Sequence, residues 1–168
     1  MTFHLYIMRH AKSDWADPGT SDFNRSINKR GKKSAIRIGR WMLENNRLPQ
    51  QVISSAAVRA KQTTELVTEQ FNHISLENII YEKDLYLADV ESLLEFIKLY
   101  KNDVSSLMLV AHNPGLEQLI YFLASESEAE YKSMTTANLV IFEYPDNHFD
   151  PETDKGKLIE FIKPKELD

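Results

Sequence analysis

Two arginines and two histidines stand at or just beyond the ends of three apolar runs. Arg9 and His10 follow the first run, Arg59 lies shortly after the second, and His112 follows the third. The three runs cover residues 3–8, 51–54 and 106–110. Guanidinium groups offer forked donors that match phosphate oxygens, and a neutral imidazole is a nucleophile. These residue types together predict a site for phosphoryl transfer.

The elements that would position these side chains alternate between strands and amphipathic helices. We predict strands over 3–8, 51–54, 78–81 and 106–110, and a closing antiparallel pair over 138–144 and 157–163. We predict helices over 31–45, 57–71 and 89–101, and a fourth that starts at Asn113-Pro114, with Asn113 as N-cap. The expected fold is α/β, a three-layer sandwich: a mostly parallel sheet with helices on both faces and an antiparallel strand pair at the C-terminus.

The strand ends give these residues a common location. Ligands of open parallel sheets bind outside the carboxyl ends of the strands, so Arg9, His10, Arg59 and His112 should meet at one edge. Neighbouring cations disfavour a charged imidazole, so we expect His10 to be neutral and nucleophilic. The helix N-terminus after His112 would add N–H donors for phosphate.

Composition excludes several other kinds of site. The chain has 168 residues, a formal net charge of −5 and no cysteine, which rules out disulfides, zinc thiolates and thiol nucleophiles. It contains neither a GxxxxGK[ST] motif nor a clear carboxylate cluster for magnesium, so we expect no metal and no cofactor. A mildly acidic chain argues against nucleic acid as the main partner. No apolar run is long enough for a membrane span or a signal peptide. We expect a single domain over residues 1–168 in the cytoplasm; the oligomeric state stays open.

The motifs around these residues resemble a known family. LYIMRHAKSDW, VISSAAVRAKQTTELV and LMLVAHNPGLEQLI, in this order, are similar to the histidine phosphatase superfamily, the phosphoglycerate-mutase-like group. The best resemblance, over residues 3–124, is to its SixA-type phosphohistidine phosphatase branch. It implies that His10 is the nucleophile, that Arg9 and Arg59 hold the phosphoryl oxygens, and that His112 is the pocket's second histidine. Asn28, a predicted helix N-cap, stands where the family often has a polar residue near the phosphate.

The sequence departs from the family pattern where mutase-like members carry a general acid. The candidates in YEKDLYLADVE are Glu82, Asp84, Asp89 and Glu91, and none has a distinctive spacing. A site without an acid suits the cleavage of a phosphorus–nitrogen bond, because imidazole, with a conjugate-acid pKa of about 6.5, is a far better leaving group than an alkoxide. The short chain also leaves few residues for a lid, which favours a phosphorylated side chain on a protein.

Three hypotheses follow from these residues. The leading one is a metal-independent hydrolase that dephosphorylates phosphohistidine on a protein through a phosphohistidine intermediate. The second is a phosphatase of small phosphate esters or anhydrides in the same superfamily, which an acid pointing into the pocket would favour. The third is a module that binds phosphorylated groups without turnover.

Overall fold

The computed structural model describes residues 1–72, 79–125, 128 and 133–167. Six strands form one sheet in the order β3-β2-β4-β1-β5-β6. The strands are β1 (Phe3–Arg9), β2 (Gln51–Ser55), β3 (Ile79–Glu82), β4 (Ser106–Ala111), β5 (Leu139–Tyr144) and β6 (Lys157–Ile162). The first four are parallel, and β5 runs antiparallel to both of its neighbours, β1 and β6. The predicted mixed sheet with a closing antiparallel pair is confirmed.

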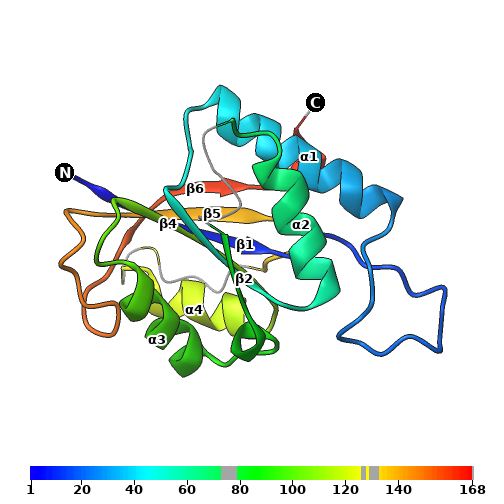
Figure 1. Ribbon diagram of the computed structural model, residues 1–168. Coiled ribbons are helices and arrows are strands. Elements are labelled where there is room, and N and C mark those ends of the chain that lie inside the picture. The colour runs from blue at the N-terminus through cyan, green and yellow to red at the C-terminus, as the bar shows by residue number, and fades with distance from the viewer. Residues whose placement is uncertain (73–78, 126–127, 129–132, 168) are drawn as a thin grey trace.

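Helices cover both faces of this sheet (Figure 1). They are α1 (Lys29–Glu44), α2 (Val58–Thr68), α3 (Val90–Tyr100) and α4 (Gly115–Leu123), with short 3₁₀ turns η2 (Lys83–Leu85) and η4 (Pro164–Glu166). Alternate residues of β1 face opposite ways, as in any strand. Leu5 and Ile7 pack in the core beneath α3 and α4, whereas Tyr6 and Met8 pack in the core beneath α1 and α2. The three-layer arrangement follows from these two apolar faces.

The N-terminal ends of α1 and α4 test the two predicted N-caps, of which one is correct and one is wrong. The Asn28 side chain accepts a hydrogen bond of 2.8 Å from the Gly31 N–H, which confirms the predicted N-cap of α1. The predicted cap at Asn113 is wrong: α4 begins at Gly115, and the Asn113-Pro114 peptide bond is cis. The Asn113 amide nitrogen instead donates to the Met134 carbonyl, at 2.9 Å, so the side chain serves a long-range contact.

The strand ends lie where the site requires them. β1 and β4 are adjacent, and their register pairs Arg9 with Ala111, so the residues that follow, His10 and His112, come out side by side. β2 lies on the other side of β4 and leads into α2. Within the described residues, no helix has the length and apolar character that crossing a membrane requires.

Candidate active site

The structure brings Arg9, His10, Arg59 and His112 together at the carboxyl edge of the sheet. The His10 and His112 ring centroids are 5.1 Å apart. Arg59, in the first turn of α2, places its Nε 3.4 Å from His10 Nε2. All four line one cavity of about 380 Å³. The convergence expected from the strand ends is therefore present in the tertiary structure.

His10 is held as a neutral imidazole with a free lone pair. Its Nδ1 lies 2.8 Å from the carbonyl oxygen of Ala11, and because a carbonyl only accepts, Nδ1 carries the proton. Nε2 is then unprotonated and accepts from Arg59 Nε. Burial, helped by the charges of Arg59, Arg9 and Arg25, lowers the pKa of His10 to about 4. At neutral pH, Nε2 therefore has the unprotonated form that a nucleophile needs.

His112 has the opposite arrangement of its ring nitrogens. Its Nε2 lies 2.7 Å from the Ser55 hydroxyl, which itself accepts a bond of 3.2 Å from the Ala57 N–H. That arrangement favours the Ser55 proton pointing to Nε2, which leaves the ring proton on Nδ1. Among the described residues, Nδ1 is buried without a partner. Burial, with lesser effects from His10 and Arg59, lowers the pKa of His112 to about 3, so it is a neutral donor rather than a cation.

Arg9 is anchored from the segment before β5. Its NH1 donates to the Met134 carbonyl at 3.0 Å, and the Met134 N–H donates to the Glu117 carboxylate at 2.6 Å. Its Nε is buried and has no partner in the described part of the chain. A buried N–H without a partner costs free energy, and a phosphoryl oxygen would satisfy it.

Arg59 is held by a loop that the sequence motifs did not single out. Its NH1 donates to the Asp22 carbonyl at 2.6 Å and its NH2 to the Asp22 carboxylate at 3.0 Å. The Tyr86 hydroxyl donates to the same carboxylate, and the Tyr86 ring meets His112 edge-on at 5.4 Å. The Tyr86 hydrogen bond, with Arg59 and Arg25, lowers the pKa of Asp22 to about 2. Asp22 is thus an ionised partner of Arg59 and not a general acid.

Arg25 is a third arginine of the cavity that the motifs did not indicate. It forms an ion pair with Asp22, donates to the Ser13 hydroxyl at 3.3 Å, and lies 3.4 Å above the Trp15 ring. Neither Asp22 nor Arg25 lies in a periodic segment, so no local pattern could have placed them. Their proximity depends on the path of the whole loop from Lys12 to Asn28.

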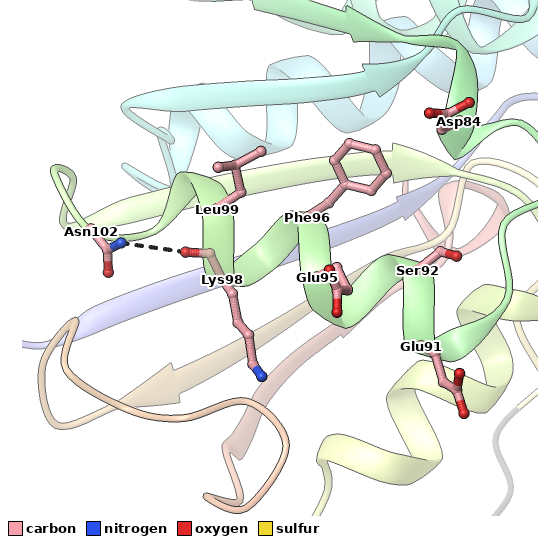
Figure 2. Close-up of a pocket in the computed structure, with 8 residues that line it drawn as sticks. All are labelled: Asp84, Glu91, Ser92, Glu95, Phe96, Lys98, Leu99 and Asn102. Carbon is pink, nitrogen blue, oxygen red and sulfur yellow. Dashed lines mark hydrogen bonds between the residues drawn. The ribbon is translucent and has the colours of Figure 1, made fainter.

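The candidate acids all lie away from this cavity. Glu82 accepts from the Tyr100 hydroxyl at 2.7 Å, and Asp89 caps α3 through the Ser92 N–H. Asp84 and Glu91 line a separate cavity of about 950 Å³ along α3, which Figure 2 shows. The described residues that line the cavity of the histidines include no carboxylate: Arg9, His10, Lys12, Ser13, Trp15, Arg25, Arg59, Leu87, His112, Asn113, Thr135 and Thr136.

Asn28 also lies outside the cavity of the histidines. Its side-chain oxygen caps α1, and its amide nitrogen donates to the Ser13 carbonyl at 3.4 Å. Both polar atoms of the Asn28 side chain thus have partners within the protein, and phosphate binding by Asn28 stays a prediction. Within the described ranges, no group of three or more His, Asp or Glu side chains has the geometry to hold a metal ion.

Comparison with known proteins identifies the family. A model of the histidine phosphatase superfamily (branch 1) matches residues 5–86. The crystal structure of the proposed phosphohistidine phosphatase SixA from Agrobacterium tumefaciens is 30% identical, with a TM-score of 0.83; the match covers 96% of this chain and 98% of that one. The protein histidine phosphatase SixA in complex with tungstate has the same fold, with a TM-score of 0.82, 21% identity, and coverage of 99% and 100% of the two chains.

Two uncharacterised proteins are also similar in sequence. One, from Mycobacterium tuberculosis, is 28% identical, covering 94% of this chain and all of the relative. The other, a chloroplast protein of Arabidopsis thaliana, is 28% identical over 130 residues, 73% of this chain but only 60% of its own length. The family match, and the SixA structure that agrees with this chain over nearly its whole length, lead to one assignment. The chain belongs to the histidine phosphatase superfamily, in its SixA-type branch.

Proposed function

We propose that this phosphatase removes the phosphoryl group from phosphohistidine on a protein, through a phosphohistidine intermediate on His10. The observation that carries the proposal is a cavity lined by three arginines and two neutral histidines, with no carboxylate among its described lining residues. These lining residues offer a nucleophile and charge stabilisation, but no carboxylic acid to protonate a leaving group.

In the first step, the lone pair of His10 Nε2 attacks phosphorus, and the bond from phosphorus to the substrate imidazole nitrogen breaks. Arg9 Nε and the Nδ1 proton of His112 would donate to the phosphoryl oxygens, and the positive charge of Arg59, whose Nε lies 3.4 Å from His10 Nε2, would stabilise them. Such preorganised donors stabilise charge in the transition state. The substrate imidazole leaves with the bonding electron pair and takes a proton from solvent.

In the second step, water attacks phosphorus and the bond to His10 Nε2 breaks. The water loses one proton to solvent, inorganic phosphate leaves, and His10 returns to its neutral form. The bond from His10 Nδ1 to the Ala11 carbonyl keeps the ring in one orientation through both steps.

The lack of a carboxylate among the described lining residues bears on the choice between nitrogen and oxygen leaving groups. An alkoxide is a strong base and requires a positioned acid, whereas imidazole, with a conjugate-acid pKa of about 6.5, leaves readily. The Asp22 carboxylate bonds to Arg59, but its pKa of about 2 keeps it ionised. The cavity therefore favours phosphohistidine over alkyl phosphate esters.

The test compares turnover of a phosphohistidine protein and of an aryl phosphate, both in the presence of a chelator. We expect phosphohistidine to be preferred by wild type and His10→Ala to lose turnover of both substrates. His4→Ala is the matched control, since His4 lies on β1, the strand that leads into His10, and contacts Glu143 outside the cavity. A labelled substrate, quenched in alkali, should leave an alkali-stable, acid-labile phosphoryl group on wild type but not on His10→Ala.

Two outcomes would contradict the proposal. Turnover of His10→Ala at the wild-type rate would reject the nucleophile. Efficient cleavage of alkyl or sugar phosphates in preference to phosphohistidine would reject the substrate class and require an acid outside the lining residues.

A further inference from the structure

α1 carries a concentration of positive charge that the proposed chemistry does not use. The helix contains six Lys and Arg side chains and one Glu, in a chain whose formal net charge is −5. Lys29, Lys33, Arg37 and Arg40 recur every three or four residues, and all four are exposed. They form a stripe on the outer face of the helix, opposite the residues that α1 buries against the sheet.

This basic stripe is not balanced within the protein. In the described part of the chain, no ion pair joins its members to an acidic side chain. The first turn of α1 contains Lys29, Arg30 and Lys32 and no acidic residue. Cations at an exposed helix N-terminus interact unfavourably with the helix dipole. The pattern therefore costs stability locally, which indicates a use outside the fold.

The stripe begins at the edge of the candidate active site. The Asn28 N–H, at the cap of α1, donates to the Lys12 carbonyl at 2.9 Å, and Lys12 lines the cavity of the histidines. A second hollow, of about 490 Å³, is lined by residues of the loop that precedes α1 and by the first turn of α1, including Lys29 and Arg30. A helix of this length extends about 24 Å, so the stripe continues well beyond the volume of a small ligand.

Two apolar side chains at the same cavity are exposed to solvent. Trp15 is 72% exposed and Leu87 is 57% exposed, and both line the cavity. Leu87 also has a φ of 53°, in the left-handed region that a leucine adopts only at a cost. Exposed aromatic and aliphatic anchors rimmed by charge are typical of protein–protein contact sites.

We propose that Trp15, Leu87, Lys12 and the basic stripe of α1 form a docking face for an acidic surface of the phosphorylated protein substrate. This inference rests on the proposed function, because docking would present a phosphohistidine to His10. The apolar anchors would contact the partner around the phosphoryl group, and the stripe would bind acidic side chains farther away. Complementary charge speeds encounter and fixes register.

A protein partner fits these observations better than nucleic acid or membrane. The rest of the chain is acidic, which disfavours a long polyanion extending beyond α1. A helix that lies on a membrane needs its apolar face free for lipid. In α1 that face, including Ala35, Ile38 and Met42, is fully buried against the sheet.

The first experiment separates docking from chemistry by using two substrates. One is a single-histidine domain with an acidic surface, phosphorylated with phosphoramidate, and the other is N-phosphoimidazole. In the variant Lys33→Glu/Arg37→Glu, we expect kcat/KM for the domain to fall at least about tenfold, and its salt dependence to flatten. Turnover of N-phosphoimidazole should stay at the wild-type level. Lys157→Glu is the control. Lys157 is exposed and lies opposite Glu143 in the register of β5 and β6, at the end of the sheet away from the candidate active site.

A second pair of variants tests the apolar anchor. Trp15→Ala should lower kcat/KM for the domain by a several-fold larger factor than kcat/KM for N-phosphoimidazole. Leu99→Ala, on α3, is the matched control, since Leu99 is 66% exposed and lies on the other cavity (Figure 2). Acidic residues of the domain are then replaced with lysine. These changes should restore the rate at which Lys33→Glu/Arg37→Glu dephosphorylates the domain, and only a direct contact between the two surfaces explains such a rescue.

Other results would overturn the inference. Wild-type turnover of the domain by Lys33→Glu/Arg37→Glu rejects docking through the stripe. Loss of binding to RNA or to anionic vesicles by that variant, with unchanged domain turnover, assigns the stripe to a different partner. A wild-type enzyme that cleaves neither substrate rejects the proposed function itself, whereas cleavage of both by wild type and double variant alike rejects only the docking.

Discussion

At the scale of single residues, the guanidinium group of Arg59 contacts both a loop residue, Asp22, and the candidate nucleophile, His10. Its NH1 and NH2 donate to Asp22, and its Nε is directed at His10. An arginine already fixed in orientation loses little entropy when it binds an oxyanion. Asp22 is therefore a positioning residue, acting on phosphate through Arg59.

We predict that Asp22→Ala lowers kcat/KM about tenfold, or about 1.4 kcal/mol, because Arg59 loses its fixed orientation. The value is at the lower end for charged hydrogen bonds, since the Asp22 side chain is 44% exposed. Tyr86→Phe should give a smaller fall, because it removes only the donor to Asp22. Steady-state kinetics and the inhibition constant of inorganic phosphate test this.

Asp17→Ala is the control for Asp22→Ala, because Asp17 lies in the same loop and bonds only to Gly19 and Thr20. Tighter inhibition by phosphate in Asp22→Ala would contradict the positioning role. It would mean that Asp22 competes with phosphate for Arg59 instead of preparing it.

At the scale of elements, the entry to α4 is packed against the turn that follows β3. A Cβ atom on Gly115 would lie 2.1 Å from the Ala88 carbonyl oxygen and 3.2 Å from a methyl group of Leu93. Only glycine allows this approach. Because His112 lies three residues before α4, the contact also sets where its ring stands relative to Tyr86.

We predict that Gly115→Ala destabilises the fold by about 1–3 kcal/mol, because the backbone around Ala88 or at the start of α4 must move to relieve the overlap. The displacement should also reduce turnover, since it shifts His112. Denaturant unfolding measures the stability. Gly19→Ala is the matched control: its added methyl would meet only the mobile end of the Asp17 side chain, at 3.2 Å. Equal unfolding midpoints for the two variants would show that the approach of α4 to Ala88 is not tight.

At the scale of the whole molecule, folding places two imidazoles in a buried, positively charged edge of the sheet. Burial lowers the pKa of His10 to about 4 and of His112 to about 3, from about 6.5 in an unfolded chain. The unfolded state therefore binds more protons than the native state between pH 6.5 and pH 4. Stability must fall as the pH decreases through that window.

We predict that lowering the pH from 7 to 5 costs about 2 kcal/mol of unfolding free energy for each of these histidines. Replacing either one with glutamine, which does not titrate, should remove roughly half of the dependence. Denaturant unfolding at several pH values measures it. The low pKa of Asp22 affects stability only below about pH 4, outside this range. An unfolding free energy that is equal at pH 5 and pH 7 would contradict the burial of the two rings.

Much of the fold and of the site followed from local sequence pattern. Period-two and helical runs predicted the strands and helices within a few residues, and the rule for parallel strands brought Arg9, His10, Arg59 and His112 to one edge. These predictions succeed because each depends on short-range periodicity and on a general property of βα units. The motif around Arg59 and the histidine after β4 also sufficed to identify the family.

The rest depended on contacts between residues far apart in the chain. Only the tertiary structure showed that Asp22 and Tyr86 hold Arg59, that Asn28 is used by its helix, and that the candidate acids lie outside the cavity. An irregular loop has no periodic pattern of apolar residues from which its path can be predicted. The role of a carboxylate depends on which side chains the folded backbone places next to it. The sequence by itself determined that Arg9, His10, Arg59 and His112 reach one edge of the sheet. Tertiary packing decided their protonation and their orientation, and it placed the four candidate acids outside the described lining of the cavity.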